Sequence, residues 1–313
     1  MPAVDVVRVL TFACVIAVHT LSTTLPLDDP RADAVAMLLH FTREAFFVLT
    51  AFVLMHTHGG RPLRPVAFWR RRLRLVGVPY VVWTVLYTAL QQVPTPLPAP
   101  ALARTLAINL GTGVGWYHLY FLLVSMQFYL LFPLFRRLLE ATRRHHLALL
   151  FGALLLQLLV DRWSDAPAPT GARAALLPYL GSFVGSYVFL LVLGGVAAMH
   201  REAVLAAVRG HPALVAVALL VTGAAAEGRY LLAVHGGTDP IPAGTVLQPV
   251  MVPWVVAVVA AFALLGLWWS RDGRSPGWIT WASERSFGVF LVHPVFLWLQ
   301  TASWALLTGR PNP

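Results

Sequence analysis

Residues 249–269 read PVMVPWVVAVVAAFALLGLWW, a run without one charged side chain. An α-helix rises 1.5 Å per residue, so about 20 apolar residues are needed to cross the roughly 30 Å hydrocarbon core of a bilayer. This run is long enough to span a membrane by itself. The rest of the chain decides whether it is a single anchor or one helix of a bundle.

Further apolar stretches reach this length or come near it. They lie at 4–25, 34–57, 75–93, 115–135, 147–161, 176–199, 212–234 and 286–308. Residues 101–112 are too short to cross alone, so they predict a re-entrant or interfacial helix and leave a tenth element open. The predicted fold is all-α: a polytopic transmembrane bundle of about nine to ten membrane helices, forming a single integral-membrane domain over residues 1–313.

The composition agrees with this class. Hydrophobic residues make up 58% of the 313 and charged residues only 12%, whereas soluble domains carry about a quarter charged residues. These values exclude a disordered chain, a coiled coil and an ordinary cytosolic enzyme. Every one of the 23 basic residues is Arg, which excludes Schiff-base lysine chemistry and a Walker-type phosphate loop. The single cysteine, Cys14, cannot form an internal disulfide.

The net charge of +10 comes from short arginine clusters between the apolar runs. With the N-terminus in the cytoplasm, 16 of the 23 arginines fall on the inner side, six fall on the outer side, and Arg43 lies within a span. Because inner loops are enriched in Lys and Arg, this distribution predicts a cytoplasmic N-terminus. The charge therefore indicates membrane topology, and we expect no nucleic-acid partner.

The first predicted helix carries three ionisable residues, Asp5, Arg8 and His19. Such residues inside a span are costly, so they are candidates for function. Arg8 and His19 are 11 positions apart, close to three helical turns, which places them on one face about 16 Å apart along the axis. A structural interpretation stays open, in which Arg8 snorkels and pairs with Asp5 while His19 bonds a nearby carbonyl. Imidazole can also transfer protons near neutral pH.

Two other segments place ionisable groups at membrane depth. Arg43 and Glu44 precede an aromatic run in the second span and should face the protein interior, where an ion pair that fixes packing is favoured slightly over direct catalysis. His118 follows Trp116 and Tyr117 at the outer start of the fourth span. An interfacial aromatic belt explains the Trp and Tyr but does not explain the His.

The run FWRRRLR at 68–74 is the densest basic segment, with Arg70, Arg71, Arg72 and Arg74. Guanidinium groups match phosphate oxygens well, so the run could bind phosphates. It could equally be ordinary inner-side charge, and composition alone favours that simpler interpretation.

Five short motifs occur in a definite order along the chain. They are Arg8 and His19 with ten residues between them, Phe46–Phe52, Arg71-Arg72-Leu73-Arg74 followed by Val78–Trp83, Tyr117–Leu122 with Gln127–Pro133, and Ser286–Pro294. In this order they resemble the acyltransferase-3 family of integral-membrane acyltransferases over nearly the whole chain. The sequence departs from the family pattern at Thr50-Ala51, where Ser-Gly is usual, and at Tyr120, where Trp is usual.

The resemblance implies an O-acyltransferase that moves an acyl group, other than an aminoacyl group, from an acyl-CoA thioester to a hydroxyl of a sugar, glycan or small glycosylated metabolite. His19 would be the general base, or else a covalent acyl carrier. Arg8 with Arg71 and Arg74 would hold the donor's phosphates, and His118 or Arg43 would supply the oxyanion donor. We expect acyl-CoA as a substrate, no permanently bound cofactor and no metal.

A transporter or exporter with a buried His and Arg path is the alternative, because intramembrane charges fit it equally well. In either case the partners are the lipid bilayer and small molecules. We expect a multi-pass protein of a cell membrane, in a bacterium the cytoplasmic membrane. The shared face of Arg8 and His19 should then line a polar tunnel, bordered by Arg71 and Arg74 at its mouth and by Arg43, Glu44 or His118 farther in.

Overall fold

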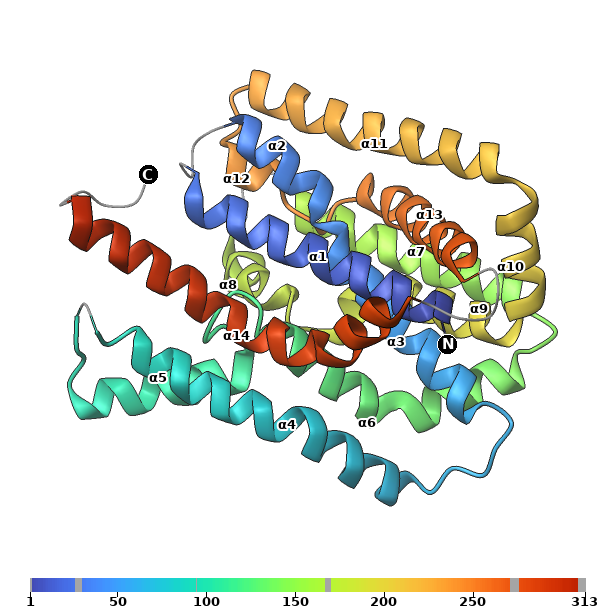
Figure 1. Cartoon of the computed structure of the whole chain (residues 1–313), viewed down its shortest axis with the longest axis horizontal. Helices are drawn as coiled ribbons and strands as arrows, with labels where there is room; N and C mark the ends of the chain where they lie inside the picture. Colours follow the sequence, from blue (N-terminus) through green and yellow to red (C-terminus); the bar gives the residue numbers. More distant parts are fainter. Residues whose placement is uncertain (1, 26–29, 94, 167–169, 271–275, 309–313) are drawn as a thin grey trace. The chain divides into compact units, whose positions relative to one another are not determined.

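The computed structural model describes residues 2–25, 30–93, 95–166, 170–270 and 276–308, and over these ranges every regular element is helical. The elements, labelled in Figure 1, are α1 (Pro2–Thr24), α2 (Pro30–Leu39), α3 (Phe41–His58), α4 (Pro65–Leu90), α5 (Ala99–Thr112), α6 (Tyr120–Ala141), α7 (His146–Asp165), α8 (Gly171–Leu180), η1 (Val184–Tyr187), α9 (Val188–Met199), α10 (Arg201–Gly210), α11 (Pro212–His235), α12 (Pro240–Ala243), α13 (Met251–Trp269) and α14 (Gly277–Thr308).

The predicted fold class is confirmed. Among the described residues, eight helices are long and apolar enough to cross a membrane, and a ninth span results if Gly171–Leu180 and Val184–Met199, bent by 67°, count as one. The segment expected at 101–112 is α5, which has only 14 residues. The protein is therefore a polytopic helical membrane protein, and α5 is shorter than a span.

Helices α1 and α14 lie side by side and run in the same direction (Figure 1). Arg8 contacts Ser283, and eleven residues later His19 contacts His293. Two parallel membrane helices enter from the same side, so the number of spans from α1 to α14 is odd. Because α5 is too short to cross, this parity favours nine spans, with the bent pair counted as one.

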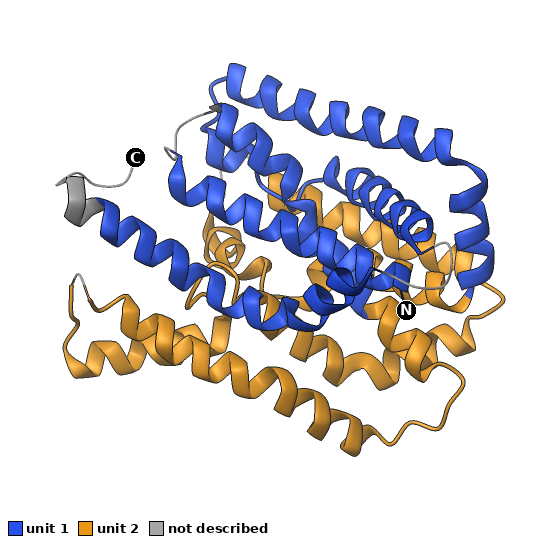
Figure 2. Ribbon diagram, in the orientation of Figure 1, with its two compact units in different colours: residues 1–50, 200–313 blue, residues 51–199 orange. Residues whose placement is uncertain are grey.

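The chain divides into two compact units, coloured separately in Figure 2. Unit 1 consists of residues 1–50 and 200–313, and unit 2 of residues 51–199. The boundary falls inside α3, so this one helix belongs to both units. The single domain expected over residues 1–313 stays a prediction.

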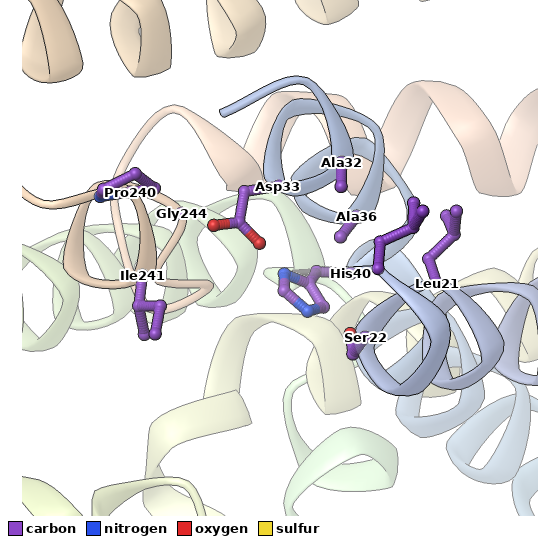
Figure 3. Close-up of a pocket in the computed structure, with 10 residues that line it drawn as sticks. Leu21, Ser22, Ala32, Asp33, Ala36, His40, Pro240, Ile241 and Gly244 are labelled. Atoms are coloured by element: carbon purple, nitrogen blue, oxygen red, sulfur yellow. The ribbon is translucent and has the colours of Figure 1, made fainter. Parts of the chain in front are cut away.

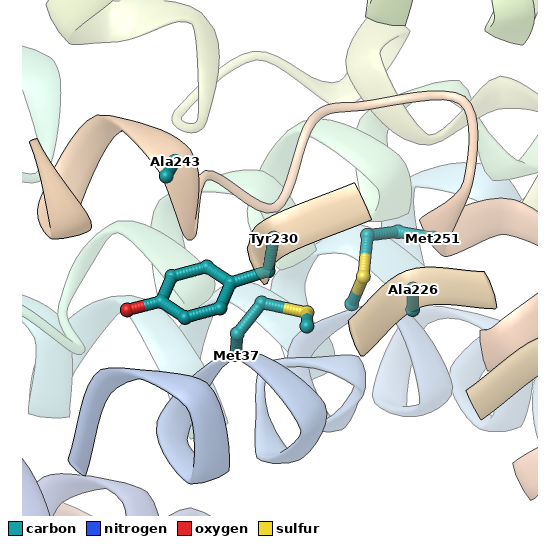
Figure 4. Packing of buried hydrophobic residues seen from close by; sticks show 5 residues of the cluster. All are labelled: Met37, Ala226, Tyr230, Ala243 and Met251. Atoms are coloured by element: carbon teal, nitrogen blue, oxygen red, sulfur yellow. The ribbon is translucent and has the colours of Figure 1, made fainter. Parts of the chain in front are cut away.

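In unit 1, a buried cluster joins α2, α11, α12 and α13 (Figure 4). Its members are Met37, Ala226, Tyr230, Ala243 and Met251. Met37 and Met251 are flexible side chains that fill gaps beside the Tyr230 ring. A Cβ at Gly266 of α13 would lie 2.7 Å from the Ala3 carbonyl oxygen of α1. Glycine at that position therefore lets the two helices approach closely.

In unit 2, α5 is anchored on α4 by polar groups within the apolar packing. The Tyr80 hydroxyl lies 3.1 Å from the Asn109 carbonyl oxygen and 2.8 Å from that of Leu110. The Asn109 side chain donates to Thr88 Oγ1 at 2.9 Å. Helix α5 ends at Gly113, whose φ of 77° is left-handed and favours glycine. These contacts hold the short helix in place although it cannot span.

Large apolar side chains are exposed on the helix surfaces, as expected where the solvent is lipid. Leu147 of α7 is 85% exposed and Leu232 of α11 is 76% exposed. In water such residues would add costly apolar surface, but hydrocarbon accepts them readily. The side on which the N-terminus lies stays a prediction, and Arg271, Arg274 and Arg310 of the charge count lie outside the described residues.

Candidate active site

Two imidazoles meet in unit 1, one from each of the parallel helices. His19 Nδ1 of α1 lies 2.7 Å from His293 Nε2 of α14. The ring planes are within 1° of each other and the centroids are 5.0 Å apart. Coplanar rings at this nitrogen to nitrogen distance form one N–H to N hydrogen bond. The question is which ring donates.

The contact between His293 and the Phe290 carbonyl, next to Pro294, shows which ring donates. Proline has no backbone N–H, so in a helix interior it leaves the carbonyl four residues earlier without its usual donor. Here that carbonyl belongs to Phe290, and His293 Nδ1 lies 2.8 Å from its oxygen. A carbonyl oxygen only accepts, so Nδ1 of His293 carries the hydrogen.

In a neutral imidazole the other nitrogen is then an acceptor. His293 Nε2 therefore accepts, and His19 Nδ1 donates to it. This tautomer leaves the lone pair of His19 on Nε2. A base with its lone pair on one nitrogen and its N–H held by a partner is the arrangement that general-base catalysis uses.

The same helix face carries polar contacts nearer the N-terminus. Arg8 Nη1 donates to Ser283 Oγ at 2.9 Å, and Ser283 Oγ donates to Asp5 Oδ1 at 2.8 Å. Arg8 also pairs with Asp5 at 3.7 Å. The predicted shared face of Arg8 and His19 is thus confirmed, as is the pairing of Arg8 with Asp5. The Arg8 side chain is still 33% exposed, so it can reach a ligand.

A cavity of about 230 Å³ lies between α1, α2 and α12 (Figure 3), and its lining on α1 begins two residues after His19, at Leu21. Its polar lining is Ser22, one turn after His19 on α1, together with Asp33 and His40. Figure 3 shows Asp33 and His40 pointing toward each other in the cavity.

His40 contributes a polar atom that the surrounding protein does not satisfy. Its ring bonds the backbone of Gly244, whereas the buried Nδ1 has no hydrogen-bond partner among the residues that the structure describes. Buried polar atoms without a partner are rare and call for an explanation. A ligand hydroxyl in the cavity would provide one.

Arg43 and Glu44 pair with each other in unit 1. Arg43 Nη2 and Nε both lie 2.9 Å from Glu44 Oε1, and both side chains are mostly buried. This is the mutual ion pair that the sequence favoured. A catalytic role for either residue stays a prediction.

His118 belongs to unit 2 and is buried among aromatic rings. Its ring meets Tyr87 edge to face at a centroid distance of 5.3 Å, and Tyr87 stacks on Trp116 at 4.8 Å. Trp116 thus packs against Tyr87 inside the unit, whereas Tyr117 is 41% exposed, as an interfacial belt residue would be. The role of His118 as an oxyanion donor stays a prediction.

The four arginines of the basic run differ in their surroundings. The Arg72 guanidinium lies 5.8 Å from the ring centroids of both Phe68 and Tyr129. Arg70 and Arg74 line an open, apolar groove on α4, and Arg71 is exposed. Consecutive helical residues point about 100° apart, so the run is spread around α4. Its binding of donor phosphates stays a prediction.

The sequence did not assign a role to His293, Ser283 or His40. A signal existed for His293, because the His-Pro pair belongs to the last of the five motifs. No comparable signal marked Ser283 and His40, because their importance comes from contacts with α1 across the fold.

Fold and site together define a multi-pass membrane protein with a hydrogen-bonded histidine pair between α1 and α14. A family model described as an acyltransferase domain matches residues 1–309. The chain therefore belongs to the acyltransferase-3 family, as the motifs predicted, and is a membrane acyltransferase. A match is found neither among the curated proteins nor among the solved structures.

Proposed function

We propose that this protein transfers an acyl group from an acyl-CoA thioester to a hydroxyl of a sugar, glycan or small glycosylated metabolite. Membership of the family supports acyl transfer as the reaction class. The 2.7 Å contact between His19 and His293 is the observation that carries the proposal, because it prepares a base that can activate a hydroxyl.

In this mechanism His19 Nε2 takes the proton of the acceptor hydroxyl while the oxygen attacks the thioester carbonyl. His293 accepts the Nδ1–H of His19 and so stabilises the imidazolium that forms. The tetrahedral intermediate collapses by breaking the carbon to sulfur bond. The imidazolium then returns its proton to the departing thiolate, giving the acyl ester and free CoA. The alternative makes His19 Nε2 the atom that carries the acyl group between donor and acceptor.

The acceptor enters the cavity that Ser22, Asp33 and His40 line. These groups can accept and donate hydrogen bonds to hydroxyls, and the unsatisfied His40 Nδ1 supports a polar occupant. The volume of about 230 Å³ is below the roughly 300–1,000 Å³ of pockets that enclose drug-sized ligands. We therefore expect only the reacting hydroxyl and the ring that bears it to enter.

The donor's phosphates bind basic side chains at the predicted cytoplasmic end of the bundle, for which the sequence names Arg8, Arg71 and Arg74. Arginine supports this role because its planar fork holds phosphate oxygens in pairs. The carbonyl oxygen that becomes negative needs a donor too, and His118 or Arg43 supplies it.

The test uses the purified full chain in detergent with acetyl-CoA and longer acyl-CoAs. Release of free thiol is followed with a thiol-reactive dye, with and without hydroxyl-bearing acceptors. We expect thiol release that acceptors accelerate, and we expect His19→Ala to lower this acceptor-dependent release by about 10²-fold or more. A folded wild-type protein that releases no thiol from any acyl-CoA would support the transporter alternative, which predicts neither hydrolysis nor transfer.

A further inference from the structure

Unit 2 contains a cavity that the site around His19 does not use. It lies between the C-terminal end of α3, the turn at residues 59–62, and the C-terminal ends of α6 and α9. Its volume is about 660 Å³, within the roughly 300–1,000 Å³ of small-molecule pockets. Three arginines line it, Arg61, Arg136 and Arg143, with Glu140 as the acid among the described lining residues.

The single acid is already engaged. Glu140 Oε1 accepts from Arg136 Nε at 2.7 Å and from the Gly60 backbone N–H at 3.2 Å. Arg61 and Arg143 form no ion pair with any residue in the described ranges. The cavity therefore carries an excess of positive charge, which attracts an anionic ligand and raises its local concentration.

The turn beside these arginines requires glycine. A Cβ at Gly59 would lie 2.6 Å from the Met55 carbonyl oxygen, and Gly60 has a left-handed φ of 68°. Residues with side chains are strained at both positions. The chain thus turns tightly from α3 toward α4, and the Gly60 N–H is held by Glu140, which places Arg61 at the cavity.

Inner-side topology explains why arginines occur at this end of the bundle, but it does not require them to converge on one cavity. Arg70–Arg74, with a similar charge, surround α4 in several directions. Arg61 follows α3, whereas Arg136 lies on α6 and Arg143 follows it. Guanidinium groups that reach one cavity from separate segments are suited to a ligand with several phosphates.

We propose that this cavity, lined by Arg61, Arg136 and Arg143, binds the 3′-phosphate and pyrophosphate of the CoA donor. The proposal rests on the use of acyl-CoA in the proposed function. It assigns the phosphates to unit 2 residues outside the basic run that the sequence singled out. Arg136 is oriented by Glu140, while Arg61 and Arg143 contribute the charge that the protein itself does not neutralise.

The test measures CoA binding to the purified full chain in nanodiscs of zwitterionic lipid by calorimetry. The variant is Arg61→Gln/Arg143→Gln, and the matched control is Arg137→Gln/Arg144→Gln, which removes the same charge from exposed positions that do not line the cavity. Each guanidinium that is replaced loses a charge-assisted hydrogen bond to phosphate, which is stronger than a neutral one. We therefore expect the Kd for CoA to rise tenfold or more in the variant and less than about threefold in the control.

Three ligands show which part of CoA the cavity binds. The loss should be large for CoA, smaller for 3′-dephospho-CoA, and absent for pantetheine, which lacks the nucleotide. Arg61→Lys/Arg143→Lys should recover part of the affinity, because it keeps the charge and loses the fork. This second variant, with its melting temperature, separates loss of binding from loss of folding.

The outcomes are distinguishable. If wild type binds no CoA, the donor class in the proposed function is wrong and this site is wrong with it. If wild type binds CoA and the Gln variant binds equally well, the site is wrong while the donor class stands. The measurement is repeated with phosphatidylglycerol in the nanodisc. If phosphatidylglycerol abolishes CoA binding to the wild type, and Arg61→Gln/Arg143→Gln abolishes binding of that lipid, the cavity is a lipid headgroup site and the proposal is overturned.

Discussion

In the proposed mechanism His19 acts through Nε2, the ring nitrogen that its contact with His293 leaves as the acceptor. The His293 ring is held by the Phe290 carbonyl, and this fixes the hydrogen of His19 on Nδ1. If Nε2 is the base, His19→Ala should lower the transfer rate by about 10²–10⁴-fold, the usual contribution of a general base. Steady-state rates with acetyl-CoA measure this. The melting temperature should change little, and a folded variant with wild-type turnover would remove His19 from the mechanism.

The partner residue gives a finer test. His293→Ala removes the acceptor of the His19 Nδ1–H, so kcat should fall by roughly 10- to 100-fold, the worth of one hydrogen bond to a charged group. His293→Gln is the matched variant, because its amide oxygen can accept the same hydrogen. We expect it to recover part of kcat with KM for acyl-CoA unchanged. Equal losses in the two variants would mean that His293 contributes only packing.

Prolines inside two helices release carbonyls that side chains then use. In α14, Pro294 releases the Phe290 oxygen, which His293 binds at 2.8 Å. In α6, Pro133 releases the Tyr129 oxygen, and Trp69 Nε1 of α4 donates to it at 3.0 Å. A helix interior without such a need loses about 3 kcal/mol to proline. Both prolines therefore exchange helix stability for a specific side-chain contact.

The α14 proline predicts opposite effects on stability and activity. Pro294→Ala restores the backbone N–H of residue 294, which can donate to the Phe290 carbonyl oxygen. The melting temperature should therefore rise or stay level. The value of kcat should fall, because His293 Nδ1 loses the acceptor that fixes its tautomer. Melting curves and steady-state rates measure the two effects. Pro79→Ala in α4 is the control, with no change in kcat expected. An unchanged kcat in Pro294→Ala would contradict the tautomer assignment.

A substitution in helix α2 can fill the cavity that we propose for the acceptor. Ala36 is buried and lines the cavity, whereas its neighbour Val35 is half exposed and does not. Ala36→Leu should reduce acceptor-dependent transfer by tenfold or more while slow hydrolysis of acyl-CoA persists, because only the acceptor is displaced. Val35→Leu should leave both unchanged. If Ala36→Leu lowers transfer and hydrolysis equally, the cavity does not hold the acceptor. Adding a large side chain to a packed site can cost about 1–3 kcal/mol, so the melting temperature is measured as well.

The whole bundle should enter and leave the membrane in the order that its arginines predict. In a Cys14→Ala background, Thr95→Cys between α4 and α5 should react with an impermeant maleimide in intact cells. His145→Cys between α6 and α7 should react only after permeabilisation. Gel shifts of the labelled protein measure both. The reverse pattern would place the N-terminus outside and move the arginine-rich cavity away from cytoplasmic acyl-CoA.

The sequence alone was sufficient for the class of fold and for one face of the site. Apolar runs near 20 residues permit only a few structures in lipid, which is why the spans agree with helices such as α11 and α13. Helical periodicity places Arg8 and His19 on one face whatever packs against it. Ordered motifs identified the family, which residues 1–309 match.

Tertiary structure decided what that face meets. Periodicity describes one helix and says nothing of its neighbour, so the contact between His19 and His293, separated by 274 positions, had no local signal. The cavities were hidden for the same reason, since Ser22 and His40, or Arg61 and Arg143, become neighbours only when separate helices pack. Packing brings together segments that are distant in the chain, and neither composition nor local spacing specifies which segments will meet.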